Sequence, residues 1–229
     1  MTTEPIIPPH GGYKTLLCYR KSAVIFLGTC AYCKRFLHHS DRTFDQMVQA
    51  ARSCKQNIIE GCQASGTKKK SEIFFTNVSR ASLEELLEDY KDQLLSNDLE
   101  PWDVKSERGI KLRDYCYARN DWPCYRKLFS IGTAEELCNL MICLLHQTGE
   151  LIDKLLEYRL KEFLKHGDVL ERIKIARHEI LSQGWSEAIY NYLSAAESPD
   201  DLEKRTREII RKAHSTQAGI AKRHDWSRD

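Results

Sequence analysis

Four long stretches of the chain carry apolar residues at the 3.6-residue period of an amphipathic helix, and this pattern constrains the fold most strongly. They cover residues 13–37, 42–64, 68–96 and 133–165. Only 11 Gly and 6 Pro occur in 229 residues, so little interrupts helices of this length. Short links make the first three helices antiparallel neighbours, and a longer link can return the fourth alongside them. The pattern therefore predicts an all-α chain built on an antiparallel up-down four-helix bundle.

Capping residues mark where these helices begin. Asp41 is placed to cap the second helix. Thr133 and Glu136 form a capping box at the start of the fourth, in which the threonine oxygen accepts a free amide and the glutamate reaches back. Ser198 precedes Pro199, which is harmless in a first helical turn because its missing N–H would be unpaired there.

Three segments follow from the pattern. Residues 1–12 are polar and contain three prolines, which predicts a disordered lead-in with no signal peptide. Residues 13–166 form the bundle. Residues 167–229 form a C-terminal helical appendix, with shorter helices over 169–183, 185–196 and 199–213.

The link over 97–132 is rich in aromatic residues, too rich for a solvated loop. We expect a folded excursion packed on one end of the bundle, with a short helix near 110–117. Its aromatic side chains are Trp102, Tyr115, Tyr117, Trp122, Tyr125 and Phe129.

The sequence contains nine cysteines, and at least four of them fall on apolar helical stripes: Cys30, Cys33, Cys54 and Cys62. A reduced thiol in such a place behaves as a small hydrophobic residue, which predicts a reducing, cytoplasmic compartment without a disulfide framework. Cys30 and Cys33 also form a CxxC, but a zinc site usually needs a second pair. Core packing is favoured over metal binding. The predicted stripe of the first helix consists of Leu16, Ala23, Phe26, Leu27, Cys30, Cys33 and Leu37.

Several function classes lack support. No run of about 18 apolar residues exists, so no membrane span is expected. No Glu is followed three residues later by His, as a di-iron bundle would require, and no glycine-rich phosphate loop is present. We expect no cofactor, no catalytic residues and no enzyme activity.

Positive charge gathers at two places although the net charge is only +2. The first forty residues hold five basic side chains against a single acid, Glu4, and a second cluster opens the third helix, where the helix dipole disfavours it. Such surfaces suit phosphate backbones, although a merely solvated face is the alternative. The candidate nucleic-acid-binding residues are Lys14, Arg20, Lys21, Lys34, Arg35, Lys68, Lys69 and Lys70.

The segment from Gln49 to Leu94 carries a further signal: Asn57-Ile58-Ile59-Glu60-Gly61, a basic turn, and Ser79-Arg80-Ala81-Ser82-Leu83 followed by Glu84-Glu85-Leu86. It resembles the bacterial four-helix-bundle family first noted as proteins encoded in intervening sequences of 23S ribosomal RNA genes. That family includes the accessory variability determinant of diversity-generating retroelements. The resemblance implies the bundle fold, a homo-oligomer with five subunits, RNA or DNA binding, and a reverse transcriptase as partner.

Within this motif we expect structural roles. Gly61 suits a helix end or close packing, and Asn57 and Glu60 can hold the next turn by hydrogen bonds. Ser79 and Ser82, on either side of Arg80, lie on an apolar stripe without the strand-to-helix elbow that a catalytic serine needs.

Two functions remain open. One is a non-catalytic, oligomeric nucleic-acid-binding scaffold. The other is a protein–protein interaction module, which the near-neutral charge and the aromatic insertion favour.

Overall fold

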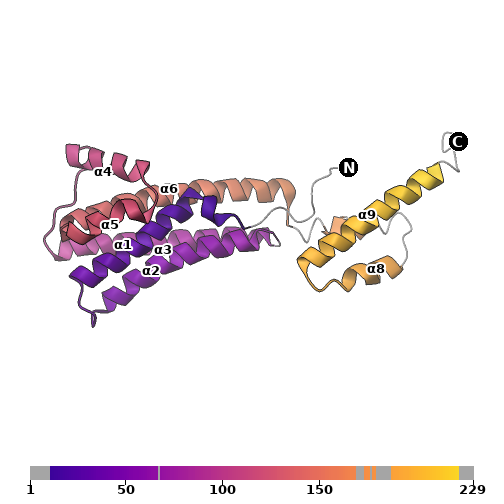
Figure 1. The fold of residues 1–229 in the computed structure, drawn as a ribbon, viewed down its shortest axis with the longest axis horizontal. Helices are drawn as coiled ribbons and strands as arrows, with labels where there is room; N and C mark the ends of the chain where they lie inside the picture. The colour runs from indigo at the N-terminus through magenta and orange to yellow at the C-terminus, as the bar shows by residue number, and fades with distance from the viewer. Residues whose placement is uncertain (1–10, 67, 169–172, 176, 179–186, 222–229) are drawn as a thin grey trace. The chain divides into compact units, whose positions relative to one another are not determined.

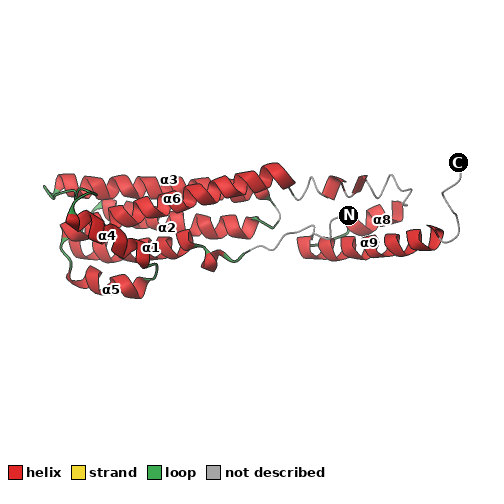
Figure 2. Ribbon diagram, turned by 90° about the horizontal axis from the view of Figure 1, so that it is seen from above, coloured by secondary structure: helices red, strands yellow, loops and turns green. Residues whose placement is uncertain are grey.

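Every element that the structure describes is a helix, which confirms the predicted all-α class (Figure 1, Figure 2). The structure is a computed structural model that describes residues 11–66, 68–168, 173–175, 177–178 and 187–221. Within those residues no helix combines the length and the apolar character that a membrane crossing needs.

The described residues fall into two compact units. His10–Ser65 together with Lys69–Lys165 form what we call the core unit. The C-terminal unit contains Gly66, Lys68 and the described residues from His166 onward. The helices of the core unit are η1 (Tyr13–Thr15), α1 (Leu17–Phe36), α2 (Arg42–Ala64), α3 (Lys69–Ser96), α4 (Glu107–Ala118), α5 (Trp122–Ile131) and α6 (Ala134–His166, whose last residue belongs to the C-terminal unit).

The predicted caps define the helix starts. The Asp41 side chain accepts the Thr43 amide at 2.9 Å, and α2 begins at the next residue, Arg42, as predicted. At the start of α6 the Glu136 amide donates to Thr133 Oγ1 at 3.2 Å, and the Thr133 amide donates to Glu136 Oε2 at 2.9 Å. Both halves of the capping box are therefore formed.

Contacts between α3 and α6 show that the two helices run antiparallel. Glu72 near the start of α3 pairs with Arg159 near the end of α6 at 2.8 Å. About two turns further along α3, Arg80 pairs with Asp153, an earlier residue of α6, at 2.6 Å. Helix α1 also runs antiparallel to α6. Lys21, early in α1, contacts Gln147, whereas Tyr32, later in α1, contacts Cys138, which is earlier in α6.

The buried face of α1 differs from the predicted stripe. Val24, Ile25 and Tyr32 are buried, whereas Leu27 is 38% exposed. The predicted stripe was wrong at Leu27, whereas its member Cys33 is fully buried. Helix α5 lies beside α1 and contacts it at Gly28, and Tyr32 contacts Tyr90 of α3 and Cys138 of α6 (Figure 2). A Cβ at Gly28 would lie 2.7 Å from the Phe129 ring of α5, so only glycine allows this close approach.

The insertion, residues 97–132, contains two helices. The helix predicted near 110–117 is α4, and α5 was not predicted. Pro123 lies in the first turn of α5, where its missing N–H does no harm, while Tyr125 and Phe129 enter the core. Tyr125 and Phe129 are thus part of the hydrophobic core and Tyr115 and Trp122 pack against it, whereas Tyr117 is exposed.

In the C-terminal unit α8 spans Glu187–Ser194 and α9 spans Pro199–Ala221. Ser198 caps α9, because its Oγ accepts the Asp201 amide at 3.1 Å. Helix α9 extends beyond its predicted end at residue 213. The predicted helix over 169–183 is helical at 173–175 and 177–178 and otherwise lies outside the described residues, as do residues 1–10 of the predicted lead-in.

Candidate functional site

The predicted phosphate-binding residues of the first helix mostly serve another purpose, because the insertion lies against them. Arg20 pairs with Asp121, the residue that precedes α5, through Nε at 3.2 Å from Oδ1 and through Nη2 to Oδ2. This hydrogen bond raises the pKa of the Arg20 guanidinium. Arg20 therefore contributes to positioning α5 on α1.

Lys21 differs most clearly from its predicted position at the surface. Its side chain is 2% exposed, and its Nζ donates to the Cys116 carbonyl at 2.6 Å and to Gln147 Oε1 at 2.9 Å. Burial lowers the pKa of Lys21. Lys21 is therefore buried and is not the surface cation that the sequence predicted, and its role in nucleic-acid binding stays a prediction.

Arg35 binds the C-terminal end of α5. Its Nη1 donates to the Phe129 carbonyl at 2.5 Å and its Nη2 to the Gly132 carbonyl at 2.9 Å. The last carbonyls of a helix lack intrahelical partners and carry the negative end of the helix dipole, so a cation stabilises them. Arg35 thus stabilises the C-terminal end of α5, while its side chain remains exposed.

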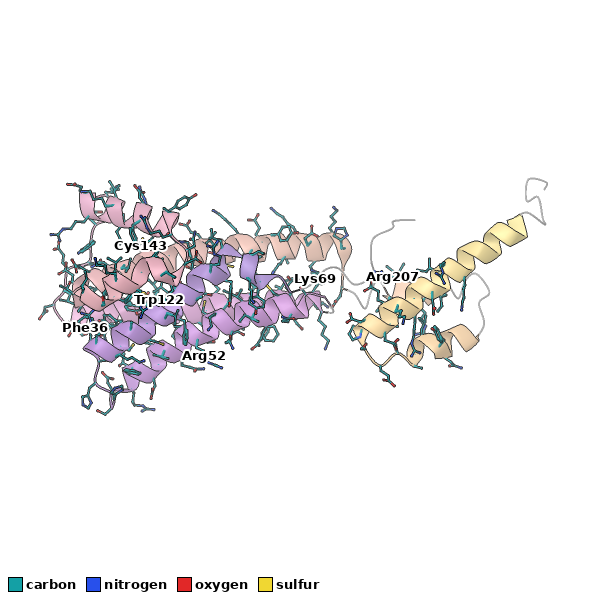
Figure 3. The ribbon with its side chains drawn as sticks, in the orientation of Figure 1. Phe36, Arg52, Lys69, Trp122, Cys143 and Arg207 are labelled. Atoms are coloured by element: carbon teal, nitrogen blue, oxygen red, sulfur yellow. The ribbon has the colours of Figure 1, made fainter. Side chains whose placement is uncertain are left out.

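The other predicted cations remain at the surface. Lys14, Lys34, Lys68 and Lys70 are exposed, and Lys70 lies over the Phe163 ring at 5.9 Å from its centroid. Lys69 pairs with Glu72 at 2.9 Å (Figure 3). The structure therefore does not assemble the eight predicted residues into one interface.

The Asn57 to Ser82 motif forms hydrogen bonds between and within helices α2 and α3. Asn57 Nδ2 donates to the Ser53 carbonyl at 2.8 Å, and Ser53 Oγ lies 2.9 Å from Ser82 Oγ. Ser79 is fully buried and donates to the Thr76 carbonyl at 2.7 Å. These serines let the two helices approach closely, whereas Glu60 and Arg80 lie at the surface.

Gly61 lies beside a buried ion pair that the sequence analysis missed. Arg159 and Glu72 are 4% and 6% exposed, and they join α6 to α3 next to the end of α2. Arg159 Nη1 donates to Thr76 Oγ1, and Nη2 donates to Cys62 Sγ at 3.1 Å. A Cβ at Gly61 would lie 3.1 Å from Arg159 Nη1. The Glu72 carbonyl oxygen would lie 3.2 Å from the same Cβ, so alanine fits here only if the guanidinium or the α3 backbone shifts.

A signal for this cluster was present in the sequence. Glu72 stands four residues before Thr76 on the buried stripe of α3, and Arg159 stands seven residues after Ile152 on that of α6. A charged residue at a stripe position indicates a buried partner of opposite charge.

A cavity of about 400 Å³ lies between α6 and the α4 segment of the insertion. Asn139 fixes one wall, because its Oδ1 accepts the Trp102 amide at 2.8 Å and its Nδ2 donates to the Glu100 carbonyl at 2.9 Å. Trp102 Nε1 donates to Glu135 Oε1 at 2.7 Å. The cavity, called the thiol pocket below, is lined by Trp102, Val104, Gly109, Leu112, Arg113, Asn139, Ile142, Cys143, His146, Gln147 and Glu150.

The CxxC cysteines lie in α1. Cys33 is fully buried, with Sγ 4.0 Å from Met47 Sδ, and Cys30 is half-buried. Among the residues that the structure describes, no three His, Cys, Asp or Glu side chains are grouped so that they could hold a metal ion.

Comparison with known proteins gives no relative: no family model matches the chain, and no curated protein or solved structure matches it either.

Proposed function

We propose that the protein is a non-catalytic helical scaffold that acts by protein–protein association, beginning with copies of itself. In this proposal α1, α2, α3 and α6 form an antiparallel up-down four-helix bundle, and the insertion is a layer added to it. The observation that carries the proposal is that three cationic side chains of α1 contact the insertion. Arg20, Lys21 and Arg35 each make such a contact, which favours a structural role for them over a phosphate-binding face.

The insertion presents large apolar side chains outward. Val104, Tyr117 and Ile131 are 69%, 78% and 68% exposed. Trp102 and the α1 cations anchor the same segment, so these side chains project from an ordered support. Aromatic and apolar side chains on a rigid element are typical anchors of protein interfaces, because little entropy is lost when they are buried.

The oligomeric state and partners follow from the resemblance described above. It points to five subunits in a closed ring and to a reverse transcriptase as a protein partner, while the cysteine usage points to the cytoplasm. Closed symmetry would stop growth of the assembly at a defined size.

Sedimentation velocity of the full chain tests the association surface. We expect an oligomer for the wild type and a smaller species for the variant with Val104→Ser, Tyr117→Ser and Ile131→Ser. The matched control is Leu95→Ser, which changes a 70% exposed side chain of α3 outside the insertion. Equal sedimentation of the triple variant and the wild type would refute the role of the insertion.

Nucleic-acid binding is the second candidate, because Lys14, Lys34, Lys68 and Lys70 remain exposed. Phosphate contacts release counterions, so binding of structured RNA would weaken steeply with salt. The variant Lys34→Glu with Lys70→Glu should then bind less tightly without loss of fold. Weak or salt-insensitive binding by the wild type would exclude this candidate.

A further inference from the structure

Two cysteines from different helices meet at the thiol pocket. Cys143 of α6, labelled in Figure 3, is half-buried and lines the pocket, whereas Cys116 of α4 is fully buried. Contacts join the two through Gln147 and Lys21, because Gln147 Nε2 donates to Cys143 Sγ at 3.8 Å and Lys21 Nζ donates both to Gln147 Oε1 and to the Cys116 carbonyl. The pocket thus gives a small molecule access to one thiol of an adjacent pair.

The Lys21 ammonium lies next to this pair without an acidic partner. It donates to the Cys116 carbonyl and the Gln147 amide oxygen, both neutral, and within the described part of the chain no carboxylate pairs with it. A buried cation without a counter-charge is costly. The ionisable groups that act on Lys21 are the thiols of Cys116 and Cys143, so a thiolate would supply the missing negative charge.

The environment assigns that charge to Cys143. The hydrogen bond to Cys143, together with burial, raises the pKa of the Cys116 thiol and keeps its proton in place. The same hydrogen bond lowers the pKa of the Cys143 thiol, with Lys21 and Arg113 acting in the same direction. Thiolate is the nucleophilic form of cysteine, and Cys143 is the member of the pair that the pocket exposes.

We propose that Cys143 and Cys116 form an oxidation site for a small hydroperoxide. The Cys143 thiolate attacks one peroxide oxygen and breaks the O–O bond, and the other oxygen takes up a proton and leaves as water or an alcohol. The resulting sulfenic acid at Cys143 condenses with the Cys116 thiol, which forms a disulfide and releases water. The peroxide is the two-electron oxidant, and the two sulfurs supply the electrons.

Peptide mapping of the full-length protein tests this site without any substitution. Cys124 of α5 is exposed and serves as the internal control, because no cation is paired with its thiol in the described residues. At neutral pH we expect iodoacetamide to modify Cys143 before Cys124, although Cys143 is less exposed. Hydrogen peroxide should then produce a Cys116–Cys143 disulfide with the loss of two hydrogen masses. Faster labelling of Cys124, together with no such disulfide, would overturn the proposal.

Variants separate the two steps. With Cys116→Ser, dimedone should trap a sulfenic acid at Cys143; with Cys143→Ser, Cys116 should stay reduced; and Cys124→Ser should leave the disulfide unchanged. Lys21→Met should slow the labelling of Cys143 if it keeps the helical circular dichroism of the wild type. If that variant unfolds, the order of labelling in the wild type still decides the proposal. Peroxide that oxidises Cys124 and leaves Cys143 untouched would contradict it.

Discussion

Replacing Arg159 with leucine tests the buried ion pair between α3 and α6. The guanidinium holds Glu72 at 2.8 Å and donates to Thr76 and Cys62. Leucine keeps an apolar side chain at this position but removes the cation and its hydrogen bonds. The Glu72 carboxylate then remains buried and is paired with Lys69.

The size of the effect follows from this burial. Removing one member of a buried ion pair costs about 3–5 kcal/mol, because the other charge is left without compensation. The Lys69 side chain is 22% exposed and still pairs with Glu72, so we expect the lower end, about 3 kcal/mol. At about 2–4 °C per kcal/mol for a chain of this size, the melting temperature should fall by roughly 6–12 °C. Thermal unfolding followed by circular dichroism measures it.

Arg80→Ala is the matched control, because it removes another ion pair between the same two helices. The Arg80 and Asp153 side chains are 53% and 54% exposed, so solvent screens the pair and its loss should cost less than about 1 kcal/mol. Adding Glu72→Leu to Arg159→Leu should recover part of the lost stability, since no buried charge then remains unpaired. Equal losses for Arg159→Leu and Arg80→Ala would refute the reasoning.

Three further substitutions test other contacts. Gly61→Ala should destabilise the protein by about 1–3 kcal/mol, because its Cβ would press on the Arg159 guanidinium, whereas Gly149→Ala should stay within about 1 kcal/mol of the wild type in urea unfolding. Thr133→Ala should cost about 1 kcal/mol in the same assay by removing half of the capping box. Arg35→Ala should speed amide hydrogen exchange in α5 and leave exchange in α3 unchanged; unchanged exchange in α5 would contradict the role of Arg35.

Local signals in the sequence predicted much of the fold. The cap at Asp41 and the unbroken helical period predicted where α2 begins and ends. The capping box at Thr133 predicted where α6 begins. Such signals act within one or two helical turns, so they predict a helix end correctly without knowledge of what the helix packs against. Helix α5 was not predicted because its ten residues are rich in aromatic side chains and resemble part of an aromatic loop. Their helical structure becomes understandable only from their packing against α1.

The candidate site depended on contacts that no local pattern encodes. Lys21 meets Cys116, a residue 95 positions later, and this contact turns an expected surface cation into a buried one. The periodicity of α1 allowed two faces to be buried, and the position of the insertion decided between them. Glu72 and Arg159 were more accessible to sequence reasoning, because each interrupts an apolar stripe.

We propose that the surface serves protein association, because Arg20, Lys21 and Arg35 of α1 contact the insertion. The most direct test is sedimentation velocity of the wild-type protein at micromolar concentration in the presence of a fluorescent structured RNA, recorded separately for protein and RNA. We predict that the protein sediments as an oligomer and that the RNA sediments as it does alone. A monomeric protein, or RNA that co-sediments with the protein and is released by moderate salt, would contradict this account.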